Sequence, residues 1–270
     1  MKSFVILAAL VFPAVATAVA GPYAPAADQP GSTAIAHDDP RFVAWGSAVG
    51  DLTRGWVDIS QPQLGKASYG SGTDALGPAD AQDDSLEVVS LGDGGSITIH
   101  FAQPITNGAG FDFAVFENGI NDTFLELGFV EVSSDGSHFV RFPSVSLTQT
   151  TTQVGGFGAL DTTNLYDLAG KYRTGFGTPF DLAELAGVDP LLDVTRVTDV
   201  RVVDVVGSIN PAYATYDSQG HIINDPWPTP YDTSGFDLDA IGALHVVPEP
   251  GVAALSGAGL LLLAGGRRRR

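Results

Sequence analysis

Apolar and polar residues alternate in a series of short segments, and this pattern constrains the fold more than any other feature of the chain. In residues 96–101, Ile97, Ile99 and Phe101 are separated by polar side chains, as expected of a strand that buries one face. Asn-Gly and Asp-Gly pairs between such segments indicate tight turns. The other strand-like segments are 86–91, 111–117, 129–133, 138–142, 197–206 and 236–246. Only residues 179–186 have a helical pattern, so we expect an all-β domain over residues 41–246, built as a single β-sandwich.

The composition excludes several classes of protein. The 270 residues contain no cysteine, so a disulfide framework, a thiolate metal cluster and a cysteine nucleophile are ruled out. With 31 acidic and 13 basic residues, the formal net charge is −18. Such a surface repels phosphate backbones, and we expect no nucleic-acid partner. A hydrophobic content of 44% is enough for a packed core.

The N-terminus has the features of a secretory signal peptide. Lys2 precedes the apolar residues 4–15, and Ala18 and Ala20 form a small-x-small cleavage site. We therefore expect residues 1–20 to be removed on export. Residues 21–40 are rich in Pro and Ala, and we expect a linker there.

The C-terminus combines three features in a fixed order. Pro248-Glu249-Pro250 is followed by an apolar stretch over 252–266 and then by Arg267, Arg268, Arg269 and Arg270. This order resembles the PEP-CTERM sorting signal over residues 247–270. The resemblance implies transient insertion of a short transmembrane helix into the inner membrane and removal of the segment by an exosortase. It also implies a Gram-negative bacterium and a final location at the cell surface or in an exopolysaccharide matrix.

Two segments of the core resemble parts of known jelly rolls. Residues 130–139 resemble the V-S-x-D-G hairpin of discoidin-type and other galactose-binding-like domains, and residues 236–241 resemble the closing strand of that superfamily. Segments 112–119, 169–172, 177–182 and 225–229 resemble a family of bacterial cell-surface proteins. The resemblance implies a galactose-binding-like jelly roll with a structural calcium ion.

The acidic residues of the second half favour a calcium site. Asp237 and Asp239 are two residues apart in an expected strand, so their side chains would share a face and repel each other without a compensating cation. Carboxylates and loop carbonyls are the oxygen ligands that calcium prefers, although no EF-hand pattern is present. The candidate ligands are Asp239, Asp237, Asp204, Asp217, Asp225 and Asp112.

Aromatic residues in the long acidic loop 210–234 favour sugar binding. Sugar rings stack on aromatic faces, so Tyr213, Tyr216 and Tyr231 are the candidate ligand-binding residues. Trp227, between two prolines, is expected to pack the loop onto the sandwich. We therefore expect an exported, calcium-stabilised glycan-binding or adhesion module without enzymatic activity.

Two alternatives remain open at the level of sequence. The first is a carbohydrate-active enzyme on the same scaffold, because Glu87, Glu117, Glu126 and Glu131 offer possible acid/base pairs. Neither a Gly-x-Ser-x-Gly motif nor a metal-like spacing of histidines is present to support another chemistry. The second is a purely structural component of the matrix.

Overall fold

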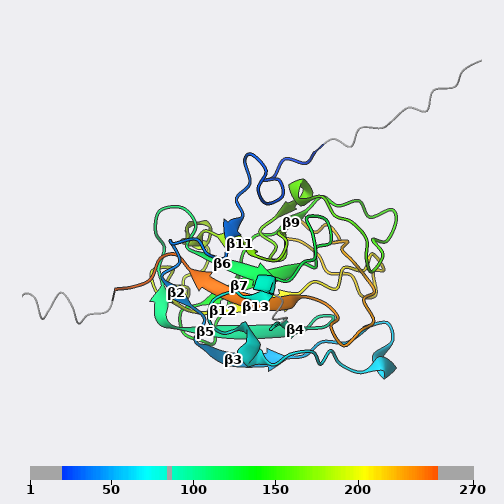
Figure 1. The fold of residues 1–270 in the computed structure, drawn as a ribbon, viewed down its shortest axis with the longest axis horizontal. Helices are drawn as coiled ribbons and strands as arrows, with labels where there is room; N and C mark the ends of the chain where they lie inside the picture. Colours follow the sequence, from blue (N-terminus) through cyan, green and yellow to red (C-terminus); the bar gives the residue numbers. More distant parts are fainter. Residues whose placement is uncertain (1–19, 84–86, 249–270) are drawn as a thin grey trace, which may run out of the picture.

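The computed structural model describes residues 20–83 and 87–248, which form antiparallel β-sheets connected by long loops (Figure 1). The expected cleavage residue Ala18 and most of the sorting signal, Glu249 to Arg270, lie outside the described residues. Ala20 and Pro248 are described, and both are exposed. No helix in residues 20–83 and 87–248 is long and apolar enough to cross a membrane.

One sheet has six strands. Its order is β1 (Ile35–Ala36), β11 (Phe176–Phe180), β6 (Phe113–Glu117), β13 (Asp237–Ala243) and β2 (Ala44–Trp45), and β4 (Val89–Ser90) also pairs with β13. The second sheet has five strands, in the order β3 (Ala48–Thr53), β5 (Ser96–Ile105), β12 (Val197–Asp204), β7 (Gly128–Ser133) and β8 (Val140–Arg141). The short strands β9 (Val145–Ser146) and β10 (Leu165–Tyr166) pair with each other.

The main core contains side chains from both large sheets. All residues of β6 and β13 are buried, because these two strands contact an apolar cluster on each face of their sheet. Ile97, Ile99 and Phe101 of β5 are buried, and they belong to the same apolar cluster as Val115 of β6 and Leu238 of β13. A stacked pair of rings, Phe113 and Phe180, joins β6 to the end of β11 within this cluster. The all-β expectation is confirmed.

The helical segments of the described chain are short 3₁₀ turns. They are η1 (Pro62–Leu64), η2 (Gly72–Ala75), η3 (Ala81–Asp83), η4 (Thr162–Asn164) and η5 (Leu182–Leu185). The expected helical stretch 179–186 is reduced to η5, because β11 continues to Phe180 and Asp181 then caps the turn by accepting a hydrogen bond from the amide of Ala183.

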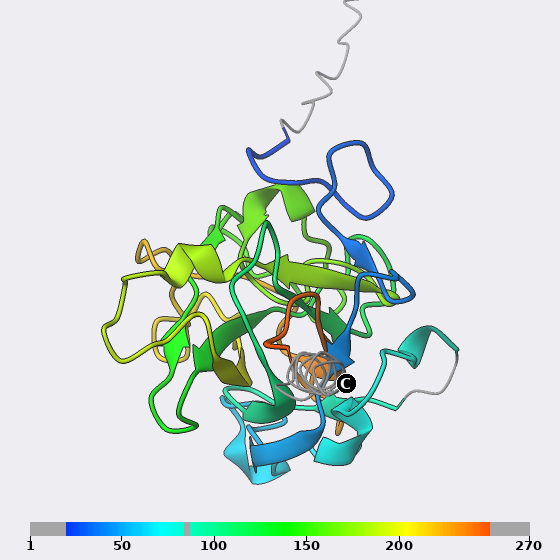
Figure 2. The same cartoon turned by 90° about the vertical axis from the view of Figure 1, so that its left-hand side faces the viewer.

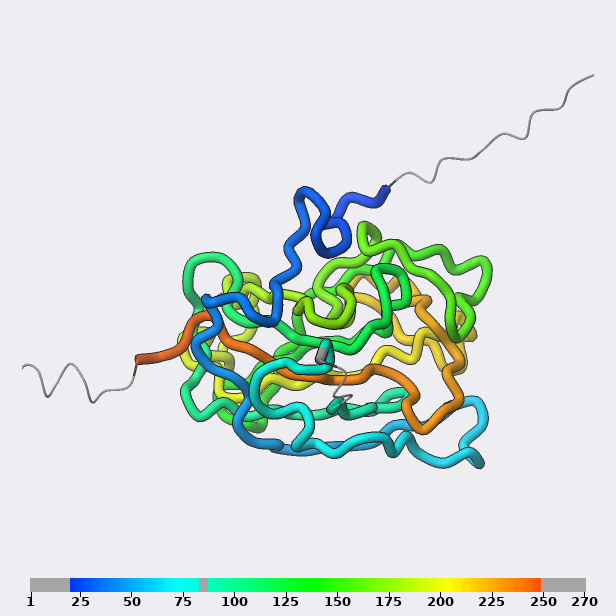
Figure 3. Tube along the Cα trace, viewed as in Figure 1, coloured from blue at the N-terminus to red at the C-terminus, as the bar shows by residue number. Residues whose placement is uncertain are grey.

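Residues 21–40, which we expected to be a linker, are part of the packed structure. Ile35 is 2% exposed and pairs with Gly177 at the edge of the six-stranded sheet. The amides of Gly21 and Tyr23 donate to Thr163, which fixes the start of the segment. Figure 3 shows this segment (dark blue) running across the upper face of the molecule. Residues 21–40 lack an alternating apolar pattern because the segment crosses over the sheets, not because it is a free linker.

The long loops gather at one end of the sheets. In Figure 1 the green loop of residues 143–165 and the gold to orange loop of residues 205–235 lie at the right-hand end, away from the described C-terminal residues. Figure 2, turned by 90°, views the opposite end, where the C-terminal strand leaves the sheets. Strands β6, β7 and β13 therefore present one set of their ends to the loops.

Candidate functional site

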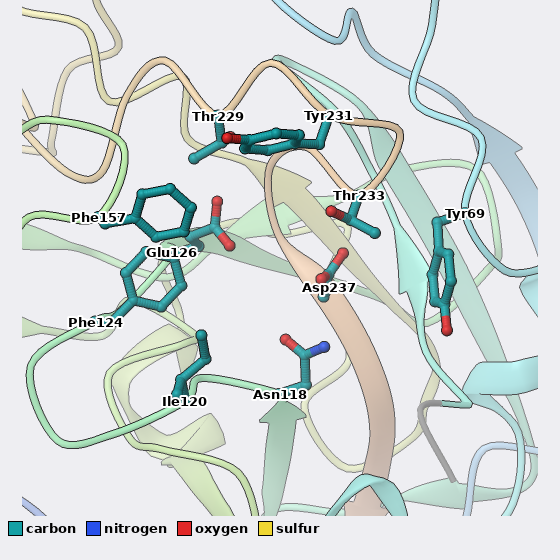
Figure 4. A pocket seen from close by; sticks show the side chains of 10 residues that line it. All are labelled: Tyr69, Asn118, Ile120, Phe124, Glu126, Phe157, Thr229, Tyr231, Thr233 and Asp237. Carbon is teal, nitrogen blue, oxygen red and sulfur yellow. The ribbon is translucent and has the colours of Figure 1, made fainter. Parts of the chain in front are cut away.

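A cavity of about 350 Å³ opens at the loop-bearing end of the sheets. Asn118 lies directly after β6, Glu126 lies shortly before β7, and Asp237 is the first residue of β13. The strand ends thus place polar side chains on one side of the cavity, and the loops place aromatic side chains around them (Figure 4). The lining residues are Tyr69, Asn118, Ile120, Phe124, Glu126, Phe157, Thr229, Tyr231, Thr233 and Asp237.

Two buried carboxyl groups line this cavity. Glu126 is 7% exposed and Asp237 is 5% exposed. Burial raises the pKa of Asp237 to about 7, while its neighbours Ser90 and Asn118 and the charge of Arg54 act in the opposite direction. Burial also raises the pKa of Glu126 well above its ordinary value, with a further contribution from the nearby charge of Asp237.

A third carboxyl group, Glu117, lies behind this pair. It is 1% exposed, and its Oε2 atom accepts a hydrogen bond of 2.7 Å from the amide of Gly119. Its Oε1 atom and Oδ1 of Asp237 have no hydrogen-bond partner among the described residues. Burial raises the pKa of Glu117 well above its ordinary range, and the charges of Asp237 and Asp239 add to the effect. Asp237 is thus a cavity-lining carboxyl group with one buried oxygen atom that no described residue bonds.

Aromatic rings form a further wall of the first cavity. The rings of Phe124 and Phe157 stack with centroids 5.8 Å apart, and those of Phe157 and Tyr231 lie 6.3 Å apart. Phe157 is 73% exposed and Tyr231 is 52% exposed, so these large rings present surface to an incoming ligand. Figure 4 shows Phe124 and Phe157 on one side of the two carboxyl groups, Tyr69 on the other and Tyr231 above them.

A buried amide holds the loop that carries Phe157. Asn224 is fully buried, and its Oδ1 atom accepts hydrogen bonds from the amide of Val154 (2.9 Å) and from Nε2 of Gln153 (3.0 Å). Its Nδ2 atom donates to the carbonyl oxygens of Gln149 and Thr152. Four hydrogen bonds from one side chain thus fix the position of this wall of the cavity.

Of the three candidate tyrosines, the structure places only Tyr231 at this cavity. The ring of Tyr213 packs beside Trp227 with centroids 6.4 Å apart. Tyr216 is 48% exposed and pairs with Ile222 in a short bridge. The indole Nε1 of Trp227 donates a hydrogen bond of 3.0 Å to Asp93, in agreement with a packing role for this residue.

Four of the six candidate calcium ligands accept backbone hydrogen bonds at separate places. Asp112 accepts from the amides of Gly108 and Leu182 and lies 2.8 Å from Nδ1 of His245. Asp204 accepts from the amides of Gly94 and Phe236. Asp225 accepts from Leu127. Asp217 accepts from Ser146, Gln219 and His221.

Asp237 and Asp239 do not form a shared site either. The pairing of β13 with β6 shifts register between Leu238 and Ala240, so the simple alternation that we expected is interrupted at Asp239. Oδ1 of Asp239 accepts from the amides of Asp80 and Ala81, whereas Asp237 lines the cavity. Within residues 20–83 and 87–248, no three His, Asp or Glu side chains lie close enough together to hold a metal ion. The six aspartates therefore do not fit one calcium site, and calcium binding stays a prediction.

Most residues of the aromatic wall were not predicted from the sequence as binding residues. Phe124 and Phe157 lie in loops without a strand pattern, and Asn118 belongs to a turn pair that we assigned only a structural role. Glu126 was named only as a possible glycosidase residue. Phe157 is an isolated large apolar residue among glycines, but a single residue of this kind is common at protein surfaces and does not by itself mark a binding site.

A second cavity of about 250 Å³ contains another carboxyl pair. Asp167 and Glu184 both line it, and the hydroxyl of Tyr166 donates to Oε1 of Glu184 at 2.8 Å. Burial and the charge of Glu184 raise the pKa of Asp167 to about 9. Lys171, which is 4% exposed, donates to the carbonyl of Leu165, and burial lowers its pKa to about 8. This cavity holds both signs of charge, unlike the first.

The chain matches no protein-family model and no curated protein. The assignment of a function therefore depends on the residues that line the first cavity.

Proposed function

We propose that the protein is an exported, exosortase-sorted module of the bacterial cell surface or extracellular matrix, and that it binds a glycan in the first cavity. One observation carries the proposal: exposed aromatic rings and buried carboxyl groups line the same cavity, with rings on several sides of the carboxyl groups (Figure 4). Sugar rings are recognised by this combination, because the apolar face of the ring stacks on an aromatic side chain while carboxylates accept hydrogen bonds from the hydroxyl groups.

The arrangement of strands supports a jelly-roll type of scaffold. Two antiparallel sheets share one core, and β7 pairs with β8, so that residues 130–139, which resemble galactose-binding-like domains, supply a strand and the turn that follows it. Binding sites of such scaffolds are formed by loops at one end of the sheets. The cavity has this position, so the proposed fold family and the proposed site agree.

Calorimetric titration with glycans selected on an array tests the proposal. We expect Tyr231→Ala to weaken binding about ten-fold, the equivalent of ~1.4 kcal/mol. Tyr216→Ala is the matched control, because Tyr216 is equally exposed but lies outside the cavity. Equal affinities of both variants and the unaltered protein would contradict the site. Failure to bind any glycan would favour the purely structural alternative.

A carbohydrate-active enzyme is the second candidate function, because Glu126 and Asp237 line one cavity and both have raised pKa values. A protonated carboxyl group is the general acid of glycoside hydrolysis, and an ionised one is the base or nucleophile. Release of reducing ends from a bound glycan would support this candidate. Loss of that release in both Glu126→Gln and Asp237→Asn, with binding retained, would assign the two residues to the reaction.

The calcium prediction requires a separate measurement. A ligand that binds the folded state raises the melting temperature by mass action. A higher melting temperature in calcium than in chelator would support a structural calcium ion. An unchanged melting temperature would contradict it.

A further inference from the structure

The first cavity contains acidic groups without basic ones. Its ionisable lining residues are Glu126, Asp237 and two tyrosines, and none of its lining residues is Lys, Arg or His. The nearest cation that acts on Asp237 is Arg54, which uses its guanidinium group to donate to the carbonyl oxygens of Tyr69, Ser90 and Gly70. None of the described residues that line the cavity therefore supplies a counter-charge to these groups.

One of the acidic groups that line the cavity has an acceptor atom that is not used. Asp237 is 5% exposed, lines the cavity and leaves Oδ1 without a hydrogen-bond partner among the described residues. A buried acceptor without a partner is unfavourable, and a buried carboxylate without a counter-ion is more so. A bound donor that carries positive charge would satisfy both requirements at once.

The aromatic wall suits the same kind of ligand. Phe124, Phe157 and Tyr231 form a continuous series of rings next to the carboxyl groups. Ring faces attract cations through their quadrupole, and aromatic cages recognise quaternary ammonium ligands in this way. A neutral sugar would use the rings for stacking but would bring no charge to compensate Asp237 when that group is ionised.

We propose that the glycan bound in this cavity carries a free ammonium group, as in a 2-amino-2-deoxy sugar residue. The inference rests on the proposed glycan-binding function. The ammonium group donates hydrogen bonds to Asp237 and Glu126, and the sugar ring faces the wall formed by Phe124, Phe157 and Tyr231. Net negative charge of the whole chain, formally −18, attracts such a ligand over longer distances.

Paired ligands that differ only in the amino group test the inference. Oligosaccharides of 2-amino-2-deoxyglucose and their fully N-acetylated counterparts would be titrated into the protein by calorimetry at low salt and neutral pH. We expect the free amine to bind at least about ten-fold more tightly. We expect Asp237→Asn to abolish this preference and Phe157→Ala to weaken binding of the amine several-fold, while Tyr216→Ala leaves it unchanged.

The outcomes separate the two proposals. Equal affinity for the amine and the N-acetylated sugar, or a preference for the acetylated form, would overturn the ammonium inference and leave glycan binding intact. Absence of binding to both, together with no hit on a glycan array, would overturn both proposals. A circular-dichroism melt of each variant verifies folding, and Phe157→Ala provides the test if Asp237→Asn does not fold, because Phe157 is largely exposed.

Discussion

Oδ1 of Asp204 accepts a hydrogen bond of 2.8 Å from the backbone amide of Phe236. The bond joins the last residue of β12 in one sheet to the residue before β13 in the other. The second carboxylate oxygen of Asp204, Oδ2, accepts a hydrogen bond of 2.9 Å from the amide of Gly94. A residue that sequence reasoning assigned to calcium thus connects three segments of backbone.

Asp204→Ala should destabilise the fold. The substitution leaves two amide groups without acceptors in a buried environment, and we expect a loss of about 1–3 kcal/mol in the free energy of unfolding. Urea unfolding followed by tryptophan fluorescence measures it. Asp51→Ala is the control, because Asp51 is exposed and such changes usually remain within about 0.5 kcal/mol. Equal effects of the two substitutions would contradict the assigned role.

The fold should lose stability as pH rises from 5 to 8. Burial raises the pKa of Asp93 to about 6, of Asp239 to about 6 and of Asp237 to about 7, from 3.8 for a free side chain. The folded state therefore binds more protons than the unfolded state across this interval, and its stability falls with pH by an amount on the order of a few kcal/mol. Thermal melts in a series of buffers measure this slope.

The dependence of stability on pH also tests for a bound cation such as calcium. A slope of the opposite sign would mean that a cation, rather than protons, compensates these carboxyl groups in the folded protein.

The acids with lowered pKa values, such as Asp189 and Asp193, lose their contribution to stability only below about pH 4. Lys171, whose pKa is lowered to about 8, changes its contribution to stability mainly above the interval from pH 5 to 8.

Asn224→Ala should reduce both stability and ligand binding. The substitution removes all four hydrogen bonds of a fully buried side chain, and we expect a cost of about 2 kcal/mol. Because the bonded residues 149–154 precede Phe157, the aromatic wall becomes less well positioned. Titration with a bound glycan, at a temperature where the variant remains folded, should give a weaker affinity. Unchanged affinity would show that Phe157 is positioned without this amide.

Glu184→Gln should lower the pKa of Asp167. Burial is the largest cause of the raised value of about 9, and the charge of Glu184 is the second. The glutamine keeps a similar shape but removes the charge, so the pKa should fall and yet remain above that of a free aspartate. Carboxyl carbon NMR titration measures the change. Asp161→Asn, at an exposed position before β10, should leave the Asp167 titration as it is; an identical titration in Glu184→Gln would contradict the coupling.

Strands with an apolar or alternating pattern were predictable, and strands without such a pattern were not. The expected segments at 96–101, 129–133 and 197–206 correspond to β5, β7 and β12, because one face of each strand enters the core. Strand β11 contains Gly177 and Pro179 and was assigned in part to a loop. Most residues of β3 are exposed or half-buried at a sheet edge, so its sequence lacks a strong apolar pattern.

The site was predictable only in its parts. Tyr231 and Asp237 were named from loop composition and strand position, and both line the cavity. The calcium hypothesis treated excess carboxylate as a need for cations. Backbone amides of other chain segments can instead donate hydrogen bonds to these carboxylate oxygens, as they do at Asp112 and Asp225. The bonds from the amide of Leu182 to Asp112 and from that of Leu127 to Asp225 join residues far apart in sequence, and no local pattern predicts them.

The buried carboxyl groups also affect how the molecule behaves as a charged particle. The formal value of −18 counts every Asp and Glu as ionised. At neutral pH Asp167 retains its proton, and burial favours the protonated form of Glu117, Glu126, Asp204 and Asp225. The electrophoretic mobility of the folded protein should therefore be lower than that of the unfolded chain at equal hydrodynamic size. In a matrix of anionic polymers, folding would thus weaken the repulsion that the composition alone would impose.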